Sequence, residues 1–181
     1  MSGEIETRMK DEAGTIRRVV VTSREGKSVV VDDAELPVLD FYGFRTTEIW
    51  ETVGIPTIPI KDEEYNKRLA FDVTPPGITR MRMALVPPDE EVFRKAGERG
   101  TDASQEWREL FDDEFRMHST DTIDYIFIVS GEVWMKLDDE AEVHLKAGDC
   151  LVFDGSRHGW RNKSSENCVM FGIMIGAKRD E

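Results

Sequence analysis

Short apolar runs alternate with turn residues along the last third of the chain, from residue 122 onward. Each run is rich in β-branched and aromatic residues, and the next run begins about ten residues later, after a glycine or an aspartate. The runs are residues 122–129, 132–139, 142–148, 149–154, 158–162 and 167–176. Regular short strands separated by turns are typical of antiparallel sandwiches and barrels, so the pattern predicts an all-β fold.

The part of the chain before residue 78 divides into a tail and an extension. Residues 1–14 are charged and lack apolar periodicity, which predicts a flexible tail. Residues 15–77 are expected to form N-terminal strands and a proline-rich connection rather than helix. The first two strands are β-branched and flank a turn that ends in Gly26, so they predict a hairpin. The three strands expected in this extension are residues 16–23, 27–33 and 46–53.

Residues 78–181 are expected to form the barrel. Residues 78–86 alternate strictly between two faces, which predicts a strand, and the proline pair that follows ends it. Apolar residues recur at helical spacing from Trp107 to Phe115, which predicts one short helix there. The alternation leaves two alternatives for Arg80 and Arg82. Either they face solvent while the methionines between them pack, or they face the interior, where one would clamp a substrate carboxylate.

The net charge of the chain limits the classes of partner that it can bind. Acidic residues (37) outnumber basic ones (24), which gives a formal net charge of −13. Nucleic-acid backbones and anionic lipids both attract basic surfaces, so we expect neither nucleic acid nor membrane as a partner. No apolar run approaches the ~20 residues that span a bilayer, and the N-terminus has no apolar signal core. Cys150 and Cys168 make no disulfide framework, which favours reduced thiols in a cytoplasmic protein.

The chain has three histidines, and they stand in different settings. His144 shares the polar side of its strand with Glu142 and Lys146, which predicts a solvated side chain. His118 and Asp124 have the same parity in a stretch that is apolar on both faces. A buried carboxylate is costly unless it is paired or binds a metal. The alternative is that Asp124 lies at the wet end of the strand, bonded to a loop.

His158 shares one strand face with Trp160 and Asn162. Two imidazoles and one carboxylate on the inward faces of neighbouring strands would form a facial set of ligands. Such a set suits Fe(II), Mn(II) or Ni(II), or zinc with one open position. We expect Asn162 to fix the loop near His158 rather than to bind the metal.

Two stretches resemble the sequence motifs of the cupin superfamily. Residues 148–162, which read GDCLVFDGSRHGWRN, resemble the second motif, with Phe153 where the family usually has proline. Residues 118–132 resemble the first motif, with Thr120 in place of its second histidine and Asp124 in place of its glutamate. The chain is similar to small single-domain proteins of the "cupin 2 conserved barrel" type.

This resemblance implies a jelly-roll β-barrel that holds one divalent metal ion, either Zn, Mn, Fe or Ni. The ligands it implies are His118, Asp124 and His158, with Thr120, Asp121 or a water in place of the missing histidine. The implied function is a metal-dependent enzyme acting on a small hydroxy, keto or phenolic acid. Its chemistry would be that of a lyase or isomerase, in which the metal stabilises an enolate or carboxylate. The alternatives are an Fe(II)-dependent dioxygenase, a non-catalytic small-molecule-binding cupin and a metal-free structural barrel.

Other residues complete the hypothesis. With every nearby histidine assigned to the metal, Asp121 and Glu132 are the expected catalytic proton carriers. Trp160, Arg80 and Arg82 are the expected substrate-binding residues. Since cupins commonly pair through their N-terminal strands, and unpaired strand edges need covering, a homodimer is expected.

Overall fold

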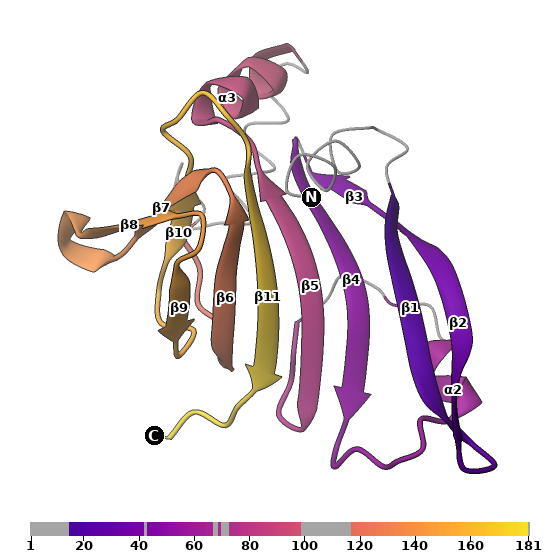
Figure 1. The fold of residues 1–181 in the computed structure, drawn as a ribbon. Helices are drawn as coiled ribbons and strands as arrows, with labels where there is room; N and C mark the ends of the chain where they lie inside the picture. The colour runs from indigo at the N-terminus through magenta and orange to yellow at the C-terminus, as the bar shows by residue number, and fades with distance from the viewer. Residues whose placement is uncertain (1–14, 42, 67–68, 70–72, 99–116, 181) are drawn as a thin grey trace.

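The computed structural model describes residues 15–180, except residues 42, 67–68, 70–72 and 99–116 (Figure 1). The tail expected at residues 1–14 and the helix expected around residues 104–115 therefore lie outside the described residues. No helix in the described part of the chain is long and apolar enough to cross a membrane.

Two antiparallel sheets and a separate hairpin make up the fold, which is a jelly-roll β-barrel. The larger sheet has six strands in the order β3-β4-β5-β11-β6-β9, and the smaller has three in the order β10-β7-β8. Strands β1 and β2 pair only with each other, next to β4 (Figure 1). The bounds are β1 Thr15–Arg24, β2 Lys27–Pro37, β3 Leu39–Phe41, β4 Phe44–Val53, β5 Ile78–Val86, β6 Thr122–Ser130, β7 Glu132–Lys136, β8 Glu142–Lys146, β9 Cys150–Phe153, β10 Gly159–Arg161 and β11 Cys168–Gly176.

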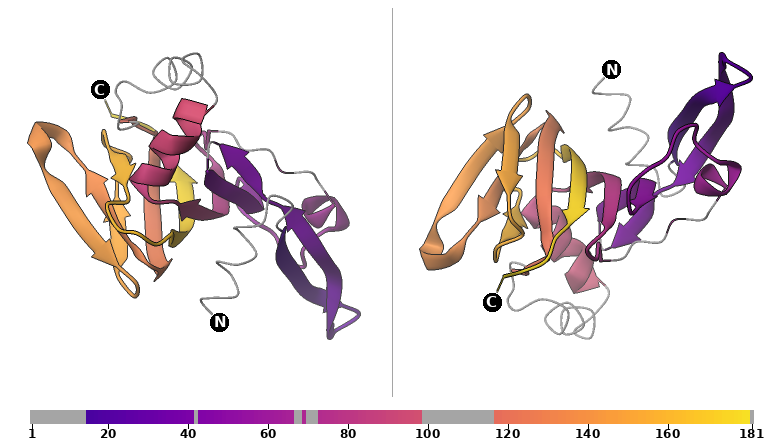
Figure 2. Two further views of the ribbon diagram at one scale, coloured as in Figure 1. Left: turned by 90° about the horizontal axis from the view of Figure 1, so that it is seen from above. Right: turned by 90° about the horizontal axis from the view of Figure 1, so that it is seen from below.

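The barrel interior lies between the two sheets. Viewed along the strands, β7 and β8 form one layer, and β5, β11 and β6 form the other (Figure 2). The buried apolar cluster between these layers consists of Ala84, Val86, Ile128, Val133, Leu145, Cys168 and Met170. On the opposite face of the large sheet, Leu85 and Val169 pack with Ile16 of the hairpin. Both faces of this sheet are therefore covered near its centre, which explains why its strands are apolar on both sides.

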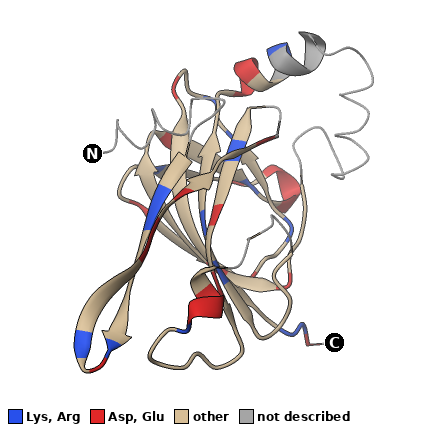
Figure 3. Ribbon diagram, turned by 90° about the vertical axis from the view of Figure 1, so that its right-hand side faces the viewer, with Lys and Arg blue, Asp and Glu red and all other residues tan. Residues whose placement is uncertain are grey.

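The strands agree closely with the sequence patterns, whereas the helices do not. Every strand expected between residues 16 and 53, at residues 78–86 and from residue 122 onward is present. The structure also has helices that were not predicted from the sequence, namely α2 (Asp62–Tyr65), α3 (Asp89–Glu98) and a 3-10 turn, η1 (Asp138–Glu140). Acidic residues lie in the first turns of both α-helices (Figure 3), where their negative charge stabilises the helix by interacting with the positive end of its dipole.

The large sheet crosses the expected boundary between the extension and the barrel. Strand β4 pairs with β5 from Arg45↔Leu85 to Val53↔Ile78. A β-bulge shifts the register of this pair between Glu48 and Trp50, so that Glu48 lies opposite Arg82 and Glu51 opposite Arg80. Residues three apart in a regular strand point to opposite faces, but the extra residue of a bulge brings both glutamates to the face of the arginines.

We expect Ile128→Ala to destabilise the barrel, because Ile128 is 0% exposed in the centre of the apolar cluster. The loss of its methyl and methylene groups leaves a cavity and should lower the free energy of unfolding by about 2–5 kcal/mol. Urea unfolding measures this change. The matched control is Ile55→Ala, since Ile55 is 93% exposed and its truncation should change the same free energy by no more than about 0.5 kcal/mol. Equal effects of both substitutions would contradict this description of the core.

Candidate functional site

His118 and His158 face each other across an isolated antiparallel bridge. Each backbone N–H donates to the other residue's carbonyl oxygen, at 2.8 and 2.9 Å. Residues that exchange both backbone hydrogen bonds carry their side chains on the same face. The two imidazole centroids accordingly lie 4.4 Å apart. The backbone pairing thus brings two of the three expected metal ligands side by side.

Asp124 lies on the interior face of β6 and is 4% exposed. Its Oδ2 accepts a hydrogen bond of 2.8 Å from the Thr122 hydroxyl, which lies 2.8 Å from the Thr120 hydroxyl. Because Thr122 donates to the carboxylate, its oxygen is left to accept from Thr120. Asp124 Oδ1 has no hydrogen-bond partner among the described residues. Thr120, which replaces a motif histidine, therefore supports Asp124 through a chain of two hydroxyls.

Gly155 allows the backbone of the second motif to approach this chain of hydroxyls. Its φ is +68°, and a Cβ on it would lie 2.2 Å from the Thr120 carbonyl oxygen and 2.5 Å from the Thr120 hydroxyl. The Thr120 N–H donates to the Gly155 carbonyl at 2.9 Å. A side chain at this position would push the two motifs apart, so both space and backbone conformation require glycine.

Aromatic rings surround His158 on the interior side. The Phe153 ring meets the His158 ring edge-on at 4.7 Å, and the Trp160 ring does so at 5.8 Å. Trp160 also packs against the apolar cluster. Phe153, which stands where cupins usually have proline, therefore fills the space beside a histidine.

Arg80 and Arg82 also belong to the interior face, where each is paired with a glutamate of β4. Arg80 donates from Nε and Nη2 to Glu51 Oε2 at 3.0 and 2.8 Å. Arg82 donates from Nε to Glu48 Oε1 at 2.5 Å and forms a second contact from Nη2. The alternative in which these arginines face solvent is wrong, since Arg80 is 8% exposed and Arg82 is half-buried.

Burial changes the protonation of three groups in this region. It lowers the pKa of His158 to about 4, with help from the nearby His118 charge, so the imidazole is neutral at pH 7. Burial raises the pKa of Asp124, against the Thr122 hydrogen bond and the Arg82 charge. Burial likewise raises the pKa of Glu48, against the charge of Arg82.

The donor atoms suit a divalent metal ion in type. His158 Nδ1–H donates to the Ser156 carbonyl oxygen at 2.7 Å, which leaves Nε2 as a lone-pair donor. Asp124 Oδ1 is a second donor without a partner among the described residues. Over the described ranges, however, no three His, Cys, Asp or Glu side chains are gathered as a metal-binding group. Holding one ion in common would need His118, Asp124 and His158 to move closer together.

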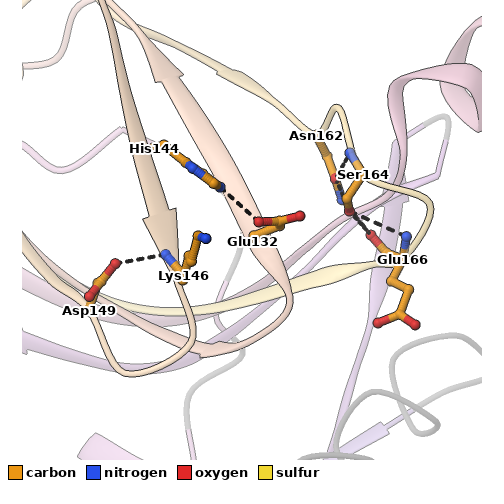
Figure 4. Close-up of polar contacts among 7 residues, drawn as sticks. All are labelled: Glu132, His144, Lys146, Asp149, Asn162, Ser164 and Glu166. Carbon is orange, nitrogen blue, oxygen red and sulfur yellow. Dashed lines mark hydrogen bonds and ion pairs between the residues drawn. The ribbon is translucent and has the colours of Figure 1, made fainter.

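The two expected proton carriers lie away from the interior. Asp121 is exposed and pairs with Arg179 at 2.9 Å. Glu132 lies on the outer face of β7, where its carboxylate is 2.8 Å from His144 Nε2 (Figure 4). The His144 ring stacks on Trp134 at the surface, with a centroid distance of 4.0 Å, so the prediction of a solvated His144 is confirmed.

Asn162 fixes the loop after His158, as expected from the sequence. Its side chain donates to the carbonyl oxygens of Val86 and Glu166, at 2.9 and 2.7 Å. Its Oδ1 accepts from the backbone N–H and the hydroxyl of Ser164 (Figure 4). These bonds tie the loop to the end of β5.

Glu48 and Glu51 are residues of the interior that were not predicted from the sequence. Their separation of three positions puts them on opposite faces of a regular strand, and only the bulge brings them together. Two acids on β4 and two alternating arginines on β5 were the available signal, but their pairing required the register.

Comparison with known proteins identifies the fold of the second half of the chain. Residues 112–175 match the family model described as "Cupin domain". This stretch of the chain is thus similar to a cupin domain. Two proteins of Diaporthe leptostromiformis, "Phomopsin biosynthesis cluster protein C'" and "Phomopsin biosynthesis cluster protein D", are each 44% identical to it over 48 residues. The match covers 26% of this chain, which spans about a quarter of the length (25%) of these curated relatives.

Solved structures with a similar fold include two bacterial proteins. One is a cupin 2 conserved barrel domain protein from Salinispora arenicola, with a TM-score of 0.40 and 14% identity over 77% of this chain and 82% of that chain. The other is a putative ethanolamine utilization protein q from Salmonella typhimurium, with a TM-score of 0.45 and 9% identity over 91% of this chain and 98% of that chain.

The low pKa of His158 predicts a pH dependence of stability in the metal-free protein. The folded pKa of about 4 lies below the unfolded value of about 6.5, so only the unfolded chain gains a proton between these values. The stabilisation is complete above about pH 6.5 and is lost as the pH falls toward 4, by roughly 3 kcal/mol in all.

Urea unfolding between pH 7 and pH 4.5, with EDTA present, tests this prediction. His158→Gln should flatten the dependence, whereas His144→Gln, at an exposed histidine, should leave it as in the wild type. An unchanged dependence in His158→Gln would place the titrating group elsewhere.

Proposed function

We propose that this chain is a metal-dependent cupin enzyme that binds one divalent ion through His118, Asp124 and His158 and acts on a small oxygenated molecule. One observation carries the proposal: two neighbouring histidines share a face beside a buried aspartate whose Oδ1 lacks a partner among the described residues. When bound, the ion would supply Lewis-acid stabilisation of negative charge on a substrate oxygen, as lyase and isomerase chemistry requires.

Other residues of the chain would position the two ligands Asp124 and His158 and exclude water from them. The Thr122 hydroxyl, which is supported by that of Thr120, donates to Asp124 Oδ2. Asp124 Oδ1 is then the oxygen that would bind the ion. The Ser156 carbonyl fixes the tautomer of His158. Phe153 and Trp160 place apolar surface against His158, which keeps water from that side.

Glu48 takes the role of proton carrier in this proposal. Asp121 and Glu132 both bond to partners at the surface, whereas Glu48 is buried on the interior face. Burial raises its pKa, and its Oε2 has no partner within the described residues. A buried carboxyl group with a raised pKa and an oxygen without a partner is a suitable group for general acid–base catalysis.

A non-catalytic barrel that binds a small molecule is the second candidate. It is favoured by the absence, within the described residues, of three gathered metal-binding side chains. The names of the two curated relatives point instead to biosynthesis. Prolonged incubation of a bound metabolite with Mn(II), Fe(II), Ni(II) or Zn(II) separates the candidates, since unchanged recovery supports the binder and conversion supports the enzyme. Conversion that needs both Fe(II) and oxygen would indicate a dioxygenase.

The proposal also includes the assembly and location of the protein. Val19, Val21 and Val30 of the hairpin are exposed, which supports pairing of two copies through β1 and β2. The free thiols of Cys150 and Cys168 and the net charge of −13 support a cytoplasmic protein without nucleic-acid or membrane partners. A monomeric mass in solution would remove the homodimer from the proposal.

Elemental analysis of natively purified protein tests the metal site. We expect about one divalent ion per chain in the wild type, and a loss of most of it in Asp124→Ala and His158→Ala, because removal of one ligand of three sharply weakens binding. The matched control is His144→Ala, which removes a surface histidine and should keep full occupancy. A metal-free wild type, or full occupancy in His158→Ala, would refute the ligand assignment.

A further inference from the structure

The two buried Arg–Glu pairs leave one donor and one acceptor unused on the interior face. Arg80 donates from Nε and Nη2 to Glu51, and Glu48 accepts from Arg82 at Oε1. Arg80 Nη1 and Glu48 Oε2 have no hydrogen-bond partner among the residues that the structure describes. Both side chains are more than nine-tenths buried, with Arg80 8% and Glu48 7% exposed.

These two atoms belong to neighbouring positions of the sheet. Glu48 lies opposite Arg82, and Arg80 is two residues from Arg82 on the same face, so Glu48 and Arg80 are diagonal neighbours across β4 and β5. The positive charge of Arg80 acts on Glu48, and that of Arg82 acts on both Glu48 and Asp124. The pairs therefore adjoin the proposed metal-binding residue Asp124.

Unpaired polar atoms are costly when buried, so a donor and an acceptor in adjacent positions suit one group that both accepts and donates. The charge of the surroundings restricts that group further. Two arginines and two glutamates cancel, and Asp124 adds a negative charge beside them. A carboxylate would gain no net attraction here and would face the Glu48 and Asp124 carboxylates.

We propose that Arg80 and Glu48 form a subsite for a neutral hydroxyl or carboxamide group of the bound molecule, and not for a carboxylate. Arg80 Nη1 would donate a hydrogen bond to the oxygen of this group, and Glu48 Oε2 would accept one from its O–H or N–H. This inference rests on the proposed function, whose substrate class it narrows to molecules with a neutral polar group at this position. It replaces the bidentate carboxylate clamp expected from the sequence, because both arginines already hold a carboxylate each.

Lactamide and lactate are matched probes, because they share a carbon skeleton and a hydroxyl and differ in the charge of one group. Ligand-observed NMR on the full chain, with EDTA present so that no cation attracts lactate, measures both affinities. We expect lactamide to bind at least about tenfold more tightly than lactate. Glu48→Gln leaves Arg82 without its counter-ion and should reverse this preference.

The control is Asp33→Asn, which makes the same change of net charge on the exposed hairpin, where Asp33 pairs with Arg17. It should leave the preference as in the wild type. If Glu48→Gln does not fold, Glu51→Gln replaces it as the test. Glu51 is the partner of Arg80, so this variant also removes one negative charge from the interior and should shift the preference toward lactate. The proposal fails if the wild type prefers lactate, if neither probe binds, or if Glu48→Gln and Asp33→Asn behave alike.

Elemental analysis distinguishes this failure from that of the proposed function. A wild type that holds its metal through His158 but shows no preference for lactamide would overturn the subsite alone. The expected preference in a protein that never binds metal would overturn the metal-dependent function and uphold the subsite.

Discussion

The register of β5, β11 and β6 decides what the interior of this barrel contains. The three strands pair without interruption through the rows Arg80↔Met174↔Asp124 and Arg82↔Gly172↔Ile126. Because side chains alternate, a slip of one residue would exchange the interior set for the outer one. It would bury Met81, Met83 and Tyr125 in place of two arginines and an aspartate. The apolar cluster around Ile128 and Met170 favours this register, because the register keeps these side chains between the two sheets.

The interior is therefore apolar at one end and charged at the other. Ala84 and Val86 continue the face of Arg80 and Arg82 into the apolar cluster, and Ile128 continues that of Asp124. Unpaired charges beside such a cluster would be expelled or neutralised. The bulge in β4 prevents this, because it supplies a second glutamate to the face of the arginines. The polar end thus tolerates ionised groups, and a few of their atoms have no hydrogen-bond partner among the described residues.

Strands could be predicted from the sequence because their signals are local. Alternation in residues 78–86 and turn residues after each later run gave their positions, and the motif around His158 indicated the barrel. The pairing of Glu48 with Arg82 could not be predicted, because it depends on one extra residue in a bulge and on the register of two strands. Helix α3 was not predicted, although its acidic first turn, which follows two prolines, is a local signal for the start of a helix.

Thr120 stands where the first cupin motif has its second histidine, and it gives the proposed site a different kind of support. A histidine there would offer another nitrogen, whereas threonine offers a hydroxyl that donates to Thr122 and, through it, supports Asp124. The hydrogen bond from Thr122 stabilises the ionised carboxylate, while burial opposes it, and burial is the larger effect. Asp124 is therefore held in place by the two hydroxyls but keeps a strong demand for a cation or a donor at Oδ1. In the proposed function, that demand, more than the number of histidines, makes this end of the barrel the metal-binding end.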